Sequence, residues 1–276
     1  MVKKSRKITI SALIIAKNEN KMLTNCLKSV AWCDEIIVVD NGSTDDTVSI
    51  AENFGAKVIA FKHQSFARLR EEALKRVKTD WLFYVDADER VTPTLAKEIL
   101  VQIETCDCVA LKMNRKNICY GQKFKYGGWE KDFVTRIFKK EALKGWQGDI
   151  HESPVFEGKV DDLQSTLIHL THRNTIDNMK KTVEWTKMEA DLLFKANVPK
   201  VKFSTLIRKG FMEFWRRAII WKGHKDGMAG LVEALVQGIN KVLIYIQVWE
   251  MQQTPSLDKK YEKEDLKIQQ LWQEEK

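Results

Sequence analysis

The first hundred residues alternate short apolar runs with segments of helical periodicity, and this alternation limits the fold more than any other feature of the sequence. Between the runs, apolar side chains recur at helical spacing, as at Leu23 and Leu27. Thr92 and Pro93 supply an N-cap and a first-turn proline, which predict a further helix. Strands that alternate with helices predict an α/β fold with a parallel sheet. The four apolar runs are residues 8–15, 35–40, 57–61 and 81–86.

The pattern changes twice further along the chain. Over residues 108–156 the period is nearer two and glycines are frequent, which predicts extended segments that complete a mixed sheet. Beyond residue 172 the spacing is helical almost to the end. We therefore expect an α/β domain over residues 8–172, a helical C-terminal region over 173–253 and a charged tail over 254–276.

Net charge and cysteine content limit the class of binding partner and the cellular compartment that the sequence predicts. The chain has 46 basic and 38 acidic side chains, a net charge of +8, which indicates an anionic partner. Nucleic acid, a nucleotide and a phospholipid surface all meet this condition. The five cysteines form no CxxC pair, and Cys106 and Cys108 are too close in sequence for the usual zinc arrangement. These features predict a reducing, cytosolic compartment.

The hydropathy pattern predicts neither a signal peptide nor a membrane span. Residues 1–7 are basic, but the apolar stretch behind them is short and leads into Lys17-Asn18-Glu19 rather than a small-residue cleavage site. Elsewhere no window offers about 18 uncharged apolar residues. We interpret residues 8–16 as the first strand.

Polar motifs follow three of the predicted strands. Because the carboxyl ends of parallel strands meet at one edge of the sheet, these motifs are expected to line a ligand crevice. Asp86 and Asp88 are one residue apart, so both carboxylates can share a divalent cation that a diphosphate also contacts. A solvated turn explains their spacing equally well, but their position after a wholly apolar strand favours a site. The motifs are Ala16-Lys17-Asn18-Glu19, Val39-Asp40-Asn41-Gly42-Ser43-Thr44-Asp45 and Asp86-Ala87-Asp88-Glu89.

In this order and spacing, the three motifs resemble the family 2 glycosyltransferases of GT-A fold, most closely a bacterial subgroup that includes lipopolysaccharide core β-1,4-glucosyltransferases. The resemblance covers about residues 8–155. It implies a Rossmann-like, mostly parallel sheet flanked by helices, followed by a helical C-terminal region. It also implies inverting, metal-dependent transfer from a nucleotide diphosphate donor to a hydroxyl of a lipid-linked or cell-envelope glycan such as lipopolysaccharide core. For this subgroup the implied donor is a UDP-hexose.

The resemblance assigns nucleotide and metal contacts to the motif residues. Asp40 matches the residue that contacts the base, and Ala16, Asn18 and Glu19 match the loop that lines the nucleoside. Asp86 and the adjacent Ala87 match the segment that faces ribose and metal, and Asp88 matches the direct ligand of Mn²⁺ or Mg²⁺. Arg70 lies where the family has a basic residue near the phosphates, although Glu71 replaces the asparagine that usually follows. A surface helix charge is the other interpretation of Arg70.

The segment that resembles the acceptor side is Trp146-Gln147-Gly148-Asp149-Ile150-His151-Glu152. Inverting transfer needs a carboxylate that takes the proton of the acceptor hydroxyl, and the resemblance favours Glu152, with Asp149 as the second candidate. His151 either orients Glu152, binds diphosphate or is structural. Trp146 either offers a flat face to a sugar ring or belongs to the core.

Two further basic residues are candidates for anion or metal contacts. Arg136 lies on an alternating strand and can reach an anionic group, or it can be structural. His169 matches a histidine of the subgroup that helps to bind diphosphate or metal. His172, three residues on, points to the opposite face of a strand and is expected to be structural.

The helical C-terminal region combines basic residues with aromatic ones. Phe203, Phe211 and Trp221 share a broad helical face opposite a basic one. This pattern suits either a membrane interface or packing within the protein. The resemblance favours an anionic membrane surface, so we expect a cytoplasmic protein held peripherally on the inner face of the cytoplasmic membrane. Residues 231–249 are strongly apolar but contain two charges, which predicts a packed or interfacial helix.

Two other functions remain open from the sequence. A sugar nucleotidyltransferase uses the same sheet and a metal, but it normally has a glycine-rich basic loop after the first strand, where Ala16-Lys17-Asn18-Glu19 stands. A non-catalytic sugar- or nucleic-acid-binding module would also explain the charge. No nucleic-acid partner is expected, because basic and aromatic residues do not interleave on a predicted sheet.

Overall fold

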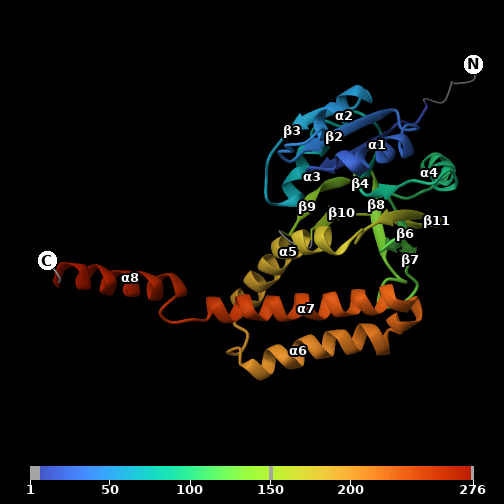
Figure 1. Cartoon of the computed structure of the whole chain (residues 1–276). Helices are drawn as coiled ribbons and strands as arrows, with labels where there is room; N and C mark the ends of the chain where they lie inside the picture. Colours follow the sequence, from blue (N-terminus) through green and yellow to red (C-terminus); the bar gives the residue numbers. More distant parts are fainter. Residues whose placement is uncertain (1–6, 149–151, 275–276) are drawn as a thin grey trace, which may run out of the picture. The chain divides into compact units, whose positions relative to one another are not determined.

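A computed structural model describes residues 7–148 and 152–274 (Figure 1). The chain forms two compact units. The first contains Met1–Phe124 and Trp129–Thr171, and the second contains Lys125–Gly128 and His172–Lys276. The loop Lys125–Gly128 therefore belongs to the second unit, although the chain returns to the first unit before it continues in the second from His172 onward.

The first four long strands of the first unit are parallel and lie in the order β3-β2-β1-β4. A helix follows each of β1, β2 and β3, which confirms the βαβ units expected from the sequence. The strands are β1 (Ile10–Ala16), β2 (Glu35–Asp40), β3 (Lys57–Ala60) and β4 (Trp81–Asp86). The helices are α1 (Asn20–Ser29), α2 (Thr47–Asn53) and α3 (Phe66–Leu74).

The remaining strands make the sheet mixed, as expected from the change of period. The order continues from β4 as β8-β6-β11-β5, and β7 pairs with β6. β8 is antiparallel to both β4 and β6, whereas β11 is parallel to β6. These strands are β5 (Glu89–Arg90), β6 (Ala110–Cys119), β7 (Gln122–Lys123), β8 (Phe133–Lys139) and β11 (Val160–Leu170). β9 (Leu143–Gln147) and β10 (Ser153–Phe156) form a separate two-stranded sheet.

The core lies on both faces of this sheet. On one face, side chains such as Ile14 and Phe83 pack against α1, α2 and α4 (Pro93–Thr105). On the other face, Leu13 and Leu82 pack against α3 and β9. Burial on both faces explains why β4 is apolar without alternation. The polar residues at the carboxyl end of β4 therefore lie at the edge of the sheet.

Helix α4 begins and docks through side-chain hydrogen bonds. Thr92 accepts a hydrogen bond from the Leu95 amide at 3.2 Å, which makes it the N-cap predicted from the sequence. Glu98 accepts from the backbone amides of Gln164 and Ser165 at 2.7 and 2.8 Å, so the helix is tied to β11.

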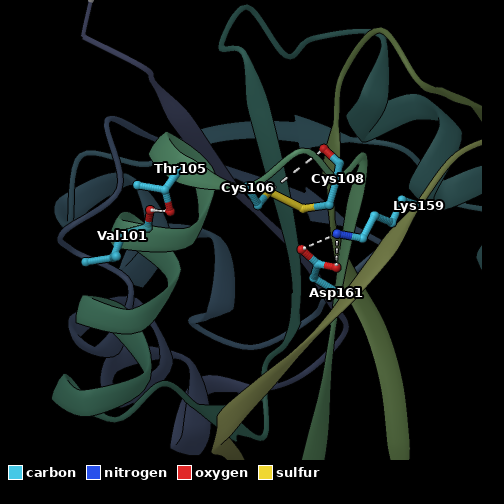
Figure 2. Close-up of a disulfide and its surroundings, with 6 residues drawn as sticks. All are labelled: Val101, Thr105, Cys106, Cys108, Lys159 and Asp161. Atoms are coloured by element: carbon cyan, nitrogen blue, oxygen red, sulfur yellow. Dashed lines mark hydrogen bonds and ion pairs between the residues drawn. A yellow bond between two sulfur atoms is a disulfide. The ribbon is translucent and has the colours of Figure 1, made fainter.

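A disulfide joins Cys106 and Cys108 directly after α4, beside the Lys159–Asp161 ion pair at the start of β11 (Figure 2). The cysteine pattern did not predict this bond and indicated a reducing compartment instead. Both sulfurs and an Asp161 oxygen lie within 4.8 Å of one another. Because the disulfide engages both sulfurs, this trio does not ligate a metal in the oxidised form described here.

The second unit is helical. Its elements are α5 (Thr175–Lys195), α6 (Phe203–Trp215), a π-helical turn (Arg216–Ile220), a 3-10 turn (Gly223–Asp226), α7 (Gly227–Met251) and α8 (Leu257–Glu274). α6 and α7 lie side by side (Figure 1). A Cβ on Gly210 of α6 would come within 2.5 Å of Val242, so glycine is required for this close approach. Asp226 accepts hydrogen bonds from the amides of Lys125 and Tyr126, which holds the early loop in this unit.

Within the described residues, Gly223–Met251 is long and apolar enough to cross a membrane by length and composition, with a mean hydropathy of 1.4. A packed core helix meets the same condition. Glu233 is 2% exposed and pairs with His172 at 2.8 Å, and Lys241 pairs with Glu189. These charges are satisfied inside the helical unit, as a packed helix requires.

Thr92→Ala removes the N-cap of α4 and should lower the free energy of unfolding by about 1 kcal/mol, because one amide in the first turn loses its acceptor. Urea unfolding followed by circular dichroism measures this change. Thr94→Ala, at an exposed position in the same first turn, is the matched control and should change stability by less than about 0.5 kcal/mol. Equal losses in both variants would contradict the capping role.

Candidate active site

The strand register brings all three polar motifs to one edge of the sheet. Ala16 at the end of β1 lies opposite Asp40 of β2, and Ile15 lies opposite Asp86 of β4. Neighbouring strands are about 4.8 Å apart, so the backbones of Asp40 and Asp86 are separated by about 10 Å. The edge that carries these carboxylates is the edge predicted from the sequence.

The loops after β1 and β2 hold each other through their own polar groups. Asn18 has a positive φ of 55°, and its Oδ1 accepts from the Thr44 amide at 2.7 Å. Its own amide donates to Ser43 Oγ at 2.9 Å. The Asp40 carboxylate accepts from the amides of Gly42 and Ser43 at 3.2 Å. Asn18 and Asp40 therefore fix the shape of the two loops.

Glu19 and Ala16 contribute through their backbone. The Glu19 amide donates to Thr47 Oγ1 at 2.8 Å, and its carbonyl accepts from the first amides of α1. The Ala16 carbonyl accepts from the Asn41 amide at 2.9 Å. These bonds join the first loop to the second.

Two buried arginines and three carboxylates alternate at the end of β4. Arg136 on β8 lies 2.5 Å from Asp86 and 3.4 Å from Glu89. Arg70 on α3 lies 3.8 Å from Asp86 and 2.8 Å from Glu152. Asp86 therefore lies between two guanidinium groups, and Arg70 connects it to the predicted base. The expectation that Arg136 reaches an anionic group agrees with this arrangement.

The charges in this cluster set its ionisation. Burial disfavours the charged form of Asp86, but Arg136 and Arg70 outweigh it and lower the pKa of that carboxyl. Burial dominates at Glu89 and raises its pKa, although Arg136 and Arg115 oppose the shift. The pKa of Arg136 is raised against the effect of burial by Asp86 and Glu89. The cations thus hold the Asp86 carboxylate ionised at the mouth of the sheet.

Aromatic side chains support Arg70 from behind. Its guanidinium carbon lies 4.5 Å from the Trp146 ring centroid, and Trp146 Nε1 donates to the Tyr84 hydroxyl at 3.2 Å. The Tyr84 hydroxyl in turn donates to the Arg70 carbonyl at 3.0 Å. Arg70 is 7% exposed and is therefore not a surface helix charge. Trp146 is 8% exposed and lies against Arg70, which favours the core interpretation over an open face for a sugar ring.

The second motif carboxylate faces a histidine. Asp88 is 8% exposed, and its Oδ2 lies 3.5 Å from His169 Nε2 on β11. The Asp88 carbonyl accepts from the Leu170 amide at 2.9 Å, which joins the motif to the end of β11. Carboxylate oxygens are donors that suit Mn²⁺ or Mg²⁺, and a neutral histidine nitrogen is a common ligand of metal ions. Asp86, Asp88 and His169 are the residues that could hold such an ion here.

The predicted residues Ala87 and His172 both make contacts within the protein. Ala87 is 4% exposed, and its carbonyl accepts from Arg90 at 2.9 Å, so Arg90 fixes the backbone of the motif. Asp149 and His151 lie outside the described residues. His172 pairs with Glu233, in agreement with the structural role expected for it.

Sequence reasoning missed four polar residues around the site, Glu89, Arg115, Asn117 and Asp132. Glu89 follows Asp88 directly, is fully buried, and accepts from the Asp86 amide at 2.9 Å. The other three lie on or beside β6 and β8, which pair only in the folded sheet. In the sequence, Glu89 was indicated only by its position directly after Asp86 and Asp88, as a third acidic residue.

Comparison with known proteins identifies the class that this fold and site define. The model of glycosyl transferase family 2 matches residues 11–155, which is more than half of the chain. The chain belongs to this family. The mixed sheet flanked by helices, with a helical C-terminal region, is the GT-A fold expected from the resemblance.

Curated relatives are similar over very different lengths. A lipopolysaccharide core biosynthesis glycosyltransferase, LpsC, of Rhizobium meliloti is 24% identical over 88% of this chain and 93% of its own length. An uncharacterized glycosyltransferase of Rickettsia felis is 44% identical over 33% of this chain and 32% of its own length. The first of these relatives spans nearly the whole chain, and the second spans about a third.

Solved structures match this chain at lower sequence identity. TarS of S. aureus in complex with UDP-GlcNAc has a TM-score of 0.46 and 14% identity, over 85% of this chain and 82% of that one. Glucosyl-3-phosphoglycerate synthase of Mycobacterium tuberculosis, with Mn²⁺ and UDP-glucose, has a TM-score of 0.47 and 17% identity, over 70% of this chain and 80% of that one.

Arg136→Met should lower the free energy of unfolding by about 3 kcal/mol or more, because it removes one partner of buried ion pairs with Asp86 and Glu89. Chemical denaturation measures this loss. Arg68→Met removes an exposed pair with Glu71 and should cost less than about 1 kcal/mol. Combining Arg136→Met with Glu89→Gln should recover part of the stability. A double variant no more stable than Arg136→Met would contradict this account.

Proposed function

We propose that the protein transfers a hexose from a UDP-sugar, with inversion, to a hydroxyl of a lipid-linked or cell-envelope glycan. The observation that carries this proposal is the convergence of Asp86 and Glu152 on one buried arginine, Arg70, at the carboxyl edge of the parallel strands. We assign the catalytic domain to residues 8–172, an acceptor- or membrane-associated region to 173–253 and a tail to 254–276.

The donor side consists of the loops after β1 and β2 and the motif after β4. We assign the base contact to Asp40, and the nucleoside contacts to Ala16, Asn18 and Glu19. The ribose lies against Asp86 and Ala87 in this proposal. The hydrogen bonds that hold Asn18 and Asp40 in place support a pocket formed before the nucleotide arrives. Such preformed sites lose less entropy on binding.

Asp86, Asp88 and His169 would hold a divalent cation, Mn²⁺ or Mg²⁺. When bound, such an ion neutralises the charge that develops on the leaving diphosphate. Arg70 and Arg136 already place two positive charges beside Asp86, so the protein itself supplies an electropositive wall for the phosphates. Desolvation of these arginines strengthens that effect.

Glu152 is the proposed general base, and Asp149 is the second candidate. The Glu152 side chain is 12% exposed and accepts from Arg70 at 2.8 Å. In a single displacement, the acceptor oxygen attacks the anomeric carbon while its proton passes to Glu152 and the diphosphate leaves from the opposite face. Arg70 positions the carboxylate and shares its charge with the donor side. We also propose that His151, which precedes Glu152 in the sequence, orients this base or binds diphosphate.

Family membership and one relative support the reaction class and the acceptor. Membership of a glycosyltransferase family favours glycosyl transfer over the sugar nucleotidyltransferase and the non-catalytic binding module that the sequence left open. The relative that spans 88% of this chain is named for lipopolysaccharide core biosynthesis. A hydroxyl of a lipopolysaccharide-type glycan is therefore the acceptor that we propose.

An exposed apolar stripe on α6 and the π-helical turn that follows it supports attachment to the inner face of the cytoplasmic membrane. The stripe recurs every four residues, so it lies along one face of the helix. Arg208, Lys209 and Arg217 adjoin it, and basic residues beside exposed aromatic ones suit an anionic lipid surface. The stripe consists of Phe203, Ile207, Phe211, Trp215 and Ile219, which are 77, 59, 59, 47 and 42% exposed.

Asp88→Ala and Glu152→Gln should each reduce transfer from a UDP-hexose by about 10²-fold or more, since one loses a metal ligand and the other the base. Release of UDP in the presence of Mn²⁺ and a lipopolysaccharide-core acceptor measures the rate. Asp162→Ala and Glu157→Gln change exposed carboxylates of the same unit and should leave the rate near wild type. Near wild-type transfer by folded Asp88→Ala or Glu152→Gln protein would overturn the proposal.

The combined change Phe203→Ser and Phe211→Ser should reduce binding to anionic liposomes at least tenfold, because each buried Phe contributes about 1.5–3 kcal/mol. Co-sedimentation with vesicles that contain phosphatidylglycerol, at low and high salt, measures the binding. Val101→Ser changes an equally exposed apolar residue on α4 and serves as the control. Failure of the wild-type protein to sediment at low salt would refute membrane attachment.

A further inference from the structure

We propose that Asn117 and Asp132 are positioning residues, which hold His169 in the Nδ1–H tautomer and so aim its unprotonated Nε2 at Asp88. This inference rests on the proposed metal site. It assigns a purpose to polar residues that neither the sequence motifs nor the family comparison singled out.

The three side chains form one hydrogen-bonded chain across neighbouring strands. Asn117 on β6 is paired in register with His169 on β11. His169 Nδ1 lies 2.7 Å from Asn117 Oδ1, and Asn117 Nδ2 donates to Asp132 Oδ2 at 3.0 Å. Arg115 Nε donates to the same Asp132 oxygen at 2.8 Å and also reaches Glu89.

The direction of this chain follows from its charged end. Burial opposes ionisation of Asp132, but the hydrogen bond and charge of Arg115 outweigh it and lower the pKa of Asp132. An ionised carboxylate only accepts hydrogen bonds, so the Asn117 NH₂ group must face it. The reverse amide orientation would bring Asn117 Oδ1 against the carboxylate. The amide oxygen is thereby directed at His169.

An amide oxygen is itself only an acceptor, so the hydrogen on His169 must be on Nδ1. In the neutral imidazole the other nitrogen then has a free lone pair. That nitrogen, Nε2, lies 3.5 Å from Asp88 Oδ2. A divalent cation is the ligand that both atoms can bind at once. Hydrogen bonds that orient a histidine ligand in this way are general in metal sites and raise metal affinity.

The burial of the Asn117 amide indicates a role beyond packing. The Asn117 side chain is fully buried, and within the part of the chain that the structure describes its hydrogen bonds lead to Asp132 and His169. Its backbone pairs with His169 of β11, and its carbonyl accepts from the Phe124 amide at 3.1 Å, so neither contact depends on the side chain. A leucine of similar size would fill the same volume without the desolvation of an amide. The amide is therefore best explained by the tautomer that it selects.

The experiment reads the tautomer directly in the metal-free protein. Long-range ¹H–¹⁵N NMR correlations distinguish Nδ1–H from Nε2–H, and His169→Gln identifies the resonance among the five histidines. Wild-type protein should show Nδ1–H at His169, and Asn117→Leu should lose it. Asn117→Leu should also weaken Mn²⁺ binding in the presence of UDP about 10- to 100-fold, measured by electron paramagnetic resonance.

Exchanging the asparagine and the aspartate between positions 117 and 132 tests whether the His169 tautomer can be rescued. In Asn117→Asp with Asp132→Asn, the new carboxylate accepts from His169 Nδ1–H and from the new amide, so the tautomer and Mn²⁺ affinity should return. Asn117→Asp alone also keeps an acceptor facing His169 Nδ1 and should retain the tautomer, but it sets two carboxylates against each other and should lower the free energy of unfolding. Asn114→Leu, at a partly buried asparagine of the same strand, is the control. It should leave both readouts at wild-type values.

The outcomes separate this inference from the function on which it rests. Nε2–H in wild-type protein, or unchanged Nδ1–H and Mn²⁺ affinity in folded Asn117→Leu, would overturn the positioning role. Nδ1–H in wild-type protein that binds no Mn²⁺ with UDP would leave the tautomer intact and refute the metal site, and with it the purpose assigned to the tautomer here.

Discussion

The ion pairs of Asp86 with Arg136 and Arg70 are the interaction on which the site depends. A carboxylate at the end of a strand buried on both faces is costly unless cations compensate it. Arg136 comes from the neighbouring strand β8, and Arg70 comes from the helix before β4. The same contacts that make the charge tolerable also fix its position. Stability and chemistry therefore use the same groups here.

Layers of support extend outward from this centre. Trp146 and Tyr84 hold Arg70 from the core side, and their rings pack edge to face at a centroid distance of 5.1 Å. On the opposite flank, Arg115 joins Glu89 to Asp132. Side chains held by packing and by hydrogen bonds lose little entropy when substrate binds. Such preorganisation is the physical basis of electrostatic catalysis.

The sequence predicted local features well and long-range pairing poorly. Periodicity located β1 to β4 and the capped start of α4, because these depend on residues close in the chain. Motifs at strand ends located Asp40, Asp86 and Asp88, because parallel strands share a carboxyl edge. Asn117 and Asp132 escaped notice, because their meeting depends on the register of β6, β8 and β11.

The burial of Arg70 and Trp146 shows the same limit. Helical spacing placed Arg70 on α3 but could not show that β9 would cover it, since β9 is about 70 residues further along. A tryptophan near a predicted sugar site is compatible with both stacking and core packing, and only the fold decides between them. The disulfide is a third case, because two residues of separation gave no indication of bond formation.

The glycine contact between α6 and α7 has a consequence for the exposed apolar stripe. With Gly210 seated against Val242, and Gly238 close to the Gly210 carbonyl, rotation of α6 about its own axis would drive side chains into a space that admits only hydrogen. The helix is thereby prevented from rolling its aromatic residues inward when no bilayer is present. Phe203 and Phe211 stay displayed in water, which makes the free protein prone to self-association.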